Sequence, residues 1–229
     1  MVRLVLFDVD GTLIHTGGAG VKAFRRTLAS LFGCPDGTEK MRFAGRTDVS
    51  LVRELFRLKR IDPTPANLER FFTGYPFWLD HLLEQCRGAV CPGVRELLEG
   101  FRQVPQPPVV GLLTGNIRLG AELKLRHFAL WDYFKTGAFA DDHEDRDQIA
   151  AVAKRRGSRL LGEELRGDEV VVVGDTPHDV QCGRAIGAQV LAVATGGASL
   201  EQLRPLRPDW LVEDLRQVTA AGMCRGAGF

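Results

Sequence analysis

The sequence lacks the features that mark several large classes of protein. No apolar run approaches the roughly 18 residues that cross a membrane, and no secretory signal peptide precedes the first apolar segment. Neither sign of charge is in excess, because 30 lysines and arginines stand against 29 aspartates and glutamates, for a net charge of +1. These absences argue against a membrane or a nucleic acid as a partner, and they predict a cytoplasmic protein that acts on a small polar molecule.

The cysteines have neither disulfide nor metal-ligand spacing. They number five, none forms a Cys-x-x-Cys pair, and none lies near a paired histidine. An odd and scattered set predicts neither a disulfide framework nor a zinc site, and it is typical of a reducing compartment. We expect Cys91 and Cys182 to be packing residues.

What the sequence does contain is a series of short apolar runs separated by helical patterns. Its hydrophobic content of 45% in 229 residues is ample for a core. Strands are predicted at 4–7, 109–113, 136–140, 170–173 and 189–193, with a short edge strand at 210–212. Continuous rather than alternating apolar runs favour strands buried on both faces. We therefore predict an α/β fold with a Rossmann-like, doubly wound parallel sheet.

One long segment carries helical patterns alone. Helices are predicted at 21–32, 48–58 and 66–86, the first stopped by Gly33 and the third kinked at 74–76. We expect residues 15–90 to form an all-helical cap domain, inserted into a core domain made of 1–14 and 91–229. At the other end of the chain, we expect fraying from Gly222 onward.

Two carboxylates follow the first strand. Asp8 and Asp10 are two residues apart, and Gly11 lets the backbone approach a ligand closely. Two such acids in a dry pocket need a cation or a shared proton. The alternative is a strand that merely ends in turn-forming aspartates.

The other predicted strands also end in polar residues. Thr114 follows the second strand, Arg146 the third, and Asp175 with Asp179 the fourth. Since the carboxyl ends of parallel strands share one edge of the sheet, these side chains should meet there, where such sheets bind ligands. Acid, hydroxyl and base at four strand ends favour a functional site over turn chemistry.

These motifs resemble the haloacid dehalogenase superfamily, in its phosphatase branch with a helical cap after the first strand. The matching motifs are Asp8-Val9-Asp10-Gly11-Thr12-Leu13, Thr114, and Gly174-Asp175-Thr176-Pro177-His178-Asp179. The cap entry and Gly115-Asn116 are most similar to phosphoglycolate phosphatase-like members. The resemblance implies a phosphatase for a small monoester, phosphoglycolate-like or a sugar phosphate, in which Asp8 attacks phosphorus and Asp10 acts as general acid and base.

The resemblance also implies a magnesium ion and a phosphate-binding set. The ion would be held by the Asp8 carboxylate, the Asp10 carbonyl, Asp175 and Asp179. Thr114, the amides of Gly11 and Gly115, and Asn116 would bind the phosphoryl group.

In one position the sequence departs from the family pattern, which places a lysine at the helix start after the third strand. Arg146 is the expected replacement, with Lys124 or Lys135 as alternatives. Arg46, at the start of a cap helix, is the first candidate for substrate specificity. His15, His143 and His178 flank the motifs and are expected to be loop or supporting residues.

Other functions stay open at this level. A phosphosugar mutase would share all the motifs. A non-catalytic phosphate-binding module becomes the better interpretation if the absence of the usual lysine abolishes catalysis. A dehalogenase needs neither a leaving-group acid nor a magnesium site, and a phospho-receiver is about half this length. A monomer and a homodimer are both compatible with the sequence.

Overall fold

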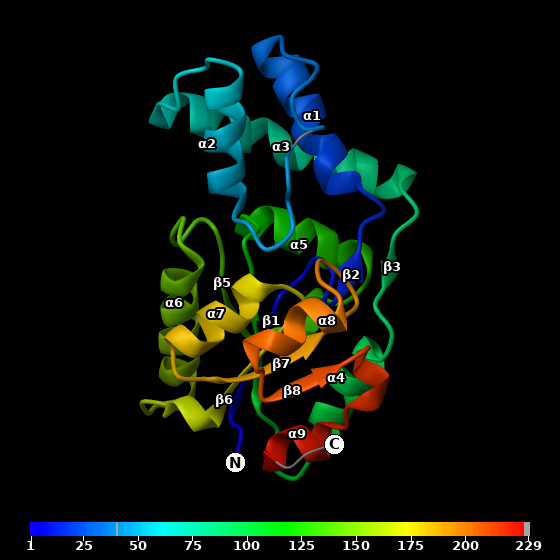
Figure 1. Ribbon diagram of the computed structural model, residues 1–229, viewed down its shortest axis with the longest axis vertical. Helices are drawn as coiled ribbons and strands as arrows, with labels where there is room; N and C mark the ends of the chain where they lie inside the picture. The colour runs from blue at the N-terminus through cyan, green and yellow to red at the C-terminus, as the bar shows by residue number, and fades with distance from the viewer. Residues whose placement is uncertain (40, 227–229) are drawn as a thin grey trace.

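The computed structural model describes residues 1–39 and 41–226, and it has a six-stranded parallel sheet at its centre (Figure 1). The strand order is β5-β4-β1-β6-β7-β8, and every pairing is parallel. The strands are β1 (Leu4–Phe7), β4 (Val109–Leu113), β5 (Thr136–Ala138), β6 (Val170–Gly174), β7 (Gln189–Val193) and β8 (Trp210–Val212). The chain adds strands on one side of β1 and then on the other, which confirms the predicted doubly wound fold.

The apolar runs form strands because helices cover both of their faces. Val5 and Phe7 of β1 pack in one cluster with α4 (Val94–Gln103), α5 (Arg118–His127) and α9 (Ala220–Arg225). Leu4 and Leu6 point to the other face, against α6 (Arg146–Leu161) and α7 (Pro177–Ala185). Short helix α8 (Leu200–Leu203) precedes β8. All four residues of β1 are fully buried.

The three helices of the inserted segment lie beyond the carboxyl edge of the sheet, at the top of Figure 1. They are α1 (Ala19–Phe32), α2 (Asp48–Leu58) and α3 (Pro65–Gln85). Gly33 ends α1 in the left-handed conformation with φ 66°, as predicted. Thr47 caps α2 by accepting a hydrogen bond from the Ser50 amide at 3.3 Å. Pro76 lies inside α3, which continues through it as one helix.

The segment 15–90 is not purely helical where it joins the sheet. Ile14–His15 (β2) pairs with Ala89–Val90 (β3) as a short antiparallel ribbon. We propose that this ribbon separates a core domain (1–14 and 91–229) from a cap domain (15–90). An apolar cluster supports the boundary, since Phe24, Phe56 and Phe71 belong to one whose buried members come from the inserted segment apart from Ile117 and Ala140.

The prediction of a frayed tail from Gly222 is wrong for residues 222–226. Helix α9 covers this stretch, and Met223 is fully buried in the apolar cluster beside α4. The Val2 amide donates to the Cys224 carbonyl at 2.9 Å. The apolar pair Met223-Cys224 therefore fixes the end of the chain, and the rest of the predicted tail, 227–229, lies outside the described residues.

The predicted strand at 136–140 is two residues too long. The Ala140 amide donates to the Asn116 carbonyl at 2.9 Å instead of continuing the sheet, which turns the chain toward the site. In the described part of the chain, no helix is long and apolar enough to cross a membrane.

Candidate active site

The register of the sheet brings the predicted motifs together. Phe7, the last residue of β1, lies opposite Leu112 of β4 and Val173 of β6. Asp8, Thr114 and Asp175 therefore emerge close together at one edge. Gly11 has φ +89°, and a Cβ there would lie 2.5 Å from Asp175 Oδ2, so only glycine permits this close approach.

Three buried carboxylates form a cluster that can hold a cation. Oxygens of Asp8, Asp175 and Asp179 all lie within 4.8 Å of one another. Burial, followed by the charge of Asp179, raises the pKa of Asp175 to about 7, and burial also raises the pKa of Asp8. A hard divalent cation takes oxygen ligands and relieves this repulsion, so the donor set fits Mg²⁺.

The two acids after β6 are held rigidly by their neighbours. Asp175 accepts hydrogen bonds from the Thr12 hydroxyl at 2.9 Å and from the Gly197 amide. Asp179 accepts from the Thr176 amide at 2.9 Å and from the Thr176 hydroxyl at 2.6 Å. These bonds orient the carboxylates before any ligand binds.

Arg146 is the base that reaches the cluster. It is the first residue of α6, where Asp145 caps the helix by accepting from the Asp147 amide at 2.8 Å. Its guanidinium donates to Asp8 Oδ1 at 3.3 Å and to Asp179. Its buried Nε makes no hydrogen bond. Of the alternatives, Lys135 is exposed and lines a different cavity.

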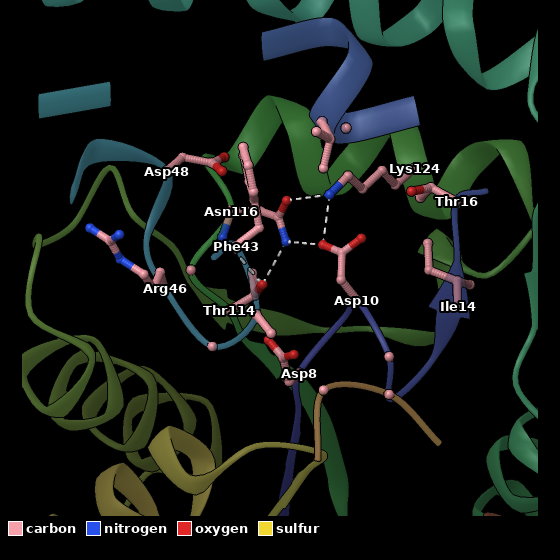
Figure 2. A pocket seen from close by; sticks show the side chains of 18 of the residues that line it. Asp8, Asp10, Ile14, Thr16, Phe43, Arg46, Asp48, Thr114, Asn116 and Lys124 are labelled. Carbon is pink, nitrogen blue, oxygen red and sulfur yellow. Dashed lines mark hydrogen bonds and ion pairs between the residues drawn. The ribbon is translucent and has the colours of Figure 1, made fainter. Parts of the chain in front are cut away.

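Lys124 lies in the same cavity but on Asp10, not on the acidic cluster. Its Nζ donates to Asp10 Oδ2 and to Asn116 Oδ1, each at 2.6 Å. Asn116 Nδ2 completes the network by donating at 2.8 Å to both Asp10 Oδ2 and Thr114 Oγ1, as Figure 2 shows. These bonds hold the Asp10 carboxylate toward the cavity and away from the acidic cluster of Asp8, Asp175 and Asp179. If Asp10 contributes to a metal site, its backbone carbonyl is therefore the expected ligand.

The loop after β4 contacts the inserted segment directly. A Cβ on Gly115 would lie 2.2 Å from the Arg46 carbonyl oxygen. The Asp48 amide donates to the Gly115 carbonyl at 2.7 Å, and the Ile117 amide donates to Asp48 Oδ2 at 2.8 Å. The start of α2 is therefore docked on the site.

Arg46 does not direct its charge into the cavity. Its guanidinium pairs with Glu54 and approaches the Ser50 carbonyl at 3.4 Å, and in Figure 2 it points away from Asp8. The expectation that Arg46 would face a substrate anion is thus not met in this conformation, because a carboxylate two turns along α2 binds the side chain.

The histidines lie at the margins. His143 accepts from the Asp145 amide at 2.9 Å and so supports the start of α6. His15 and His178 are exposed. Within residues 1–39 and 41–226, the side-chain partners of Asp8 and Asp10 are Arg146, Asn116 and Lys124, and none of these three histidines is among them.

Three features of the site escaped the sequence analysis. One is the Lys124–Asp10 pair, since Lys124 lies 114 positions from Asp10 and only the packing of α5 under α1 and α3 joins them. Another is Asp48, whose carboxylate lines the cavity and accepts from the Ile117 amide. The third is the Gly197 amide on Asp175; its signal was the glycine pair after the fifth predicted strand.

The site lines one cavity of about 420 Å³ between the sheet edge and the cap helices. It contains Asp8, Asp10, Gly11, Thr114, Gly115, Asn116, Lys124, Arg146 and Asp175, together with residues from α1, α2 and α3. A bound molecule would therefore meet the carboxylates on one side and the cap on the other.

Comparison with known proteins gives one consistent family. The chain is 28% identical over 231 residues to "Probable phosphatase IndB" of Dickeya dadantii, covering 96% of this chain and 94% of that one. It is 27% identical over 220 residues to the pyrophosphatase PpaX of Bacillus cereus, covering 93% of each. In fold it is similar to CbbY of Rhodobacter sphaeroides, solved in complex with phosphate, with a TM-score of 0.73, 18% identity, and 94% and 95% of the two chains covered.

The family model for the haloacid dehalogenase-like hydrolases matches residues 5–193, which contain every motif of the site. The buried acids, the threonine and the arginine described above follow four of the matched strands, β1, β4, β5 and β6. The chain belongs to the haloacid dehalogenase-like hydrolase family.

Proposed function

We propose that this protein is a magnesium-dependent phosphatase that hydrolyses a small phosphate monoester through an aspartyl-phosphate on Asp8. One observation carries the proposal: a buried acidic cluster with one arginine lies beside a second carboxylate, Asp10, that two amine or amide donors hold toward the cavity. The phosphatase names of relatives that align over nearly the whole chain support it.

Asp8 is the proposed nucleophile. Its carboxylate attacks phosphorus, the ester oxygen leaves, and the new Asp8–phosphorus bond divides hydrolysis into two easier steps. Water then attacks the phosphoryl group and restores the free carboxylate. When bound at Asp8, Asp175 and Asp179, Mg²⁺ would neutralise charge on the phosphoryl oxygens and on the acids.

Asp10 is the proposed general acid and base. It donates a proton to the leaving alkoxide in the first step and takes one from the attacking water in the second. Lys124 and Asn116 fix its orientation through bonds of 2.6 and 2.8 Å. The second carboxylate therefore needs no rearrangement between the steps.

The remaining residues are proposed to bind the transferred group. The Thr114 hydroxyl and the Gly115 amide are proposed to bind the phosphoryl oxygens. The Gly11 amide donates to the Ile14 carbonyl at 2.8 Å, and the Asn116 side chain donates to Asp10 and Thr114, so these two would bind the phosphoryl group only by exchanging those bonds. Arg146 supplies positive charge from the other side, in place of the family's usual lysine. The substrates first proposed are phosphoglycolate-like esters and sugar phosphates, and the proposed setting is the cytoplasm, where the five cysteines, all free in the structure, stay reduced.

The test is phosphate release with and without Mg²⁺ from an aryl phosphate, phosphoglycolate, sugar phosphates, pyrophosphate and nucleotides. We expect turnover that EDTA abolishes and that Asp8→Asn lacks. Transfer between positions of a phosphosugar without release of phosphate would assign a mutase instead. No turnover of any ester by folded protein that still binds phosphate would assign a binding module.

A further inference from the structure

The cavity extends beyond the phosphoryl site toward the cap, and that part must hold the leaving group. Its walls there come from the start of α1, the loop before α2, and α3. The side chains are mainly apolar: Ile14, Val21, Phe24, Phe43, Leu51 and Tyr75. Phe24 packs edge to face on Phe43, with ring centroids 5.5 Å apart, and against Tyr75 at 4.7 Å. This wall is therefore a preformed aromatic surface.

The cations of the cavity are already engaged. Among its described lining residues, the lysines and arginines are Arg46, Lys124 and Arg146. Arg146 forms ion pairs with the acidic cluster. Lys124 forms an ion pair with Asp10 and a hydrogen bond with Asn116, and its side chain is only 5% exposed. Arg46 pairs with Glu54 and points away (Figure 2). His15 also lines the cavity and is exposed.

Beyond Arg46, Lys124 and Arg146, the described lining residues include no further lysine or arginine, and the start of α2 contributes an acid. Asp48 lines the cavity and is 6% exposed. A carboxylate or second phosphate placed between the aromatic wall and Asp48 would lose its water and gain no cation in return. An uncharged apolar group in the same place gains about fourfold in affinity for each buried methylene.

We propose that the substrate is a phosphate monoester whose leaving alcohol is uncharged and has an apolar face, not one that carries a carboxylate or a second phosphate. The inference rests on the proposed phosphatase function and narrows its substrate class. It favours neutral esters over phosphoglycolate and over pyrophosphate.

Matched pairs of compounds test the inference. We would compare kcat/KM for phenyl phosphate with 4-carboxyphenyl phosphate, and for propyl phosphate with phosphoglycolate, in saturating Mg²⁺. The neutral member of each pair should be at least tenfold better, mainly through KM. Equal or better values for the charged members would overturn the inference while leaving the phosphatase proposal intact.

Binding of non-hydrolysable analogues separates the two proposals. Benzylphosphonate and 4-carboxybenzylphosphonate can be titrated calorimetrically whether or not any ester turns over. Tighter binding of the neutral phosphonate supports the inference, and equal or weaker binding contradicts it. Absence of Asp8-dependent hydrolysis would contradict only the proposed function.

Substitution of Phe43, one residue of the aromatic surface, gives a third test, in which ligand affinity is measured. Phe43 is half-buried, so Phe43→Ser should weaken benzylphosphonate severalfold and leave inorganic phosphate, which lacks a leaving group, unchanged. Phe43→Leu is the matched apolar control and should retain most of the affinity. An equal loss for both ligands in Phe43→Ser would show that the wall does not contact the leaving group.

Discussion

Arg146 takes the position where related sequences were expected to carry lysine, and its geometry explains why the exchange is tolerable. The guanidinium contacts Asp8 and Asp179 at once, which a single ammonium would do with fewer donors. Because both partners are buried, its single positive charge is shared between two carboxylates of the cluster. A cation at this place serves both folding and the proposed chemistry.

Removing that cation should cost more activity than shortening it. We expect Arg146→Met to lose on the order of 10²–10³ in kcat, as for other charge-stabilising donors, and Arg146→Lys to retain a measurable part of the rate. The assay is kcat at saturating Mg²⁺, beside the thermal midpoint of each variant.

Lys135→Met is the matched control, because Lys135 is exposed and lies outside the site cavity. It should equal the parent protein. Full activity in Arg146→Met, or a large loss in Lys135→Met, would remove Arg146 from the mechanism.

The Lys124 pair makes a separate prediction about Asp10. Lys124→Met takes away the 2.6 Å bond to Asp10 and leaves Asn116 alone to orient it. We expect kcat to fall about tenfold or more, with little change in the inhibition constant of phosphate. A variant that loses phosphate affinity but keeps kcat would place Lys124 in phosphate binding instead.

At the scale of elements, the docking of α2 on α5 depends on a buried carboxylate. Asp48 Oδ2 accepts from the Ile117 amide, and burial raises its pKa to about 7. A raised folded-state pKa means that the proton stabilises the fold, so the free energy of unfolding should fall as pH rises from about 4 to about 7 and then level off.

Asp48→Asn tests this contact, because the amide oxygen can still accept from Ile117 and carries no charge. We expect the variant to be more stable than the parent protein at pH 8, by up to roughly 4 kcal/mol, and similar to it near pH 4. Urea unfolding across that range is the measurement. Parallel pH curves for the two proteins would mean that Asp48 stays ionised without cost.

The elements themselves were largely predictable, and the contacts between them were not. Continuous apolar runs predicted all six sheet strands, and Gly33 marked the end of α1, because these signals are local. Asp8, Thr114 and Asp175 were predicted to lie together because each follows a parallel strand, and such strands end at one edge of the sheet. The partners of Arg46 and Lys124 were not predicted: Glu54 is one of several acids near Arg46, and Asp10 lies 114 positions from Lys124.

At the scale of the whole molecule, the loops that carry site residues also contact the inserted helices. Gly115 of the core lies against the Arg46 carbonyl, and the Thr47 hydroxyl donates to the Glu144 carbonyl at 2.9 Å. Arg53 of α2 also pairs with Glu144 at 3.0 Å. Opening the cap therefore breaks contacts with two of the loops that carry site residues.

The acidic cluster predicts that a bound Mg²⁺ ion raises the stability of the whole molecule. Asp8, Asp175 and Asp179 are buried with one arginine, so folding without a divalent ion leaves uncompensated negative charge in the core. At a free Mg²⁺ concentration 100 times its dissociation constant, linkage gives about 2.7 kcal/mol of stability. For a chain of 229 residues this corresponds to a rise in Tm of roughly 5–10 °C.

Asp175→Asn removes one ligand and one charge, so it should raise the Tm of the metal-free protein and abolish most of the Mg²⁺ shift. Calorimetric scans with Mg²⁺ and with EDTA distinguish the outcomes, and an unchanged Tm in the parent protein would mean that the cluster binds no ion in the folded state.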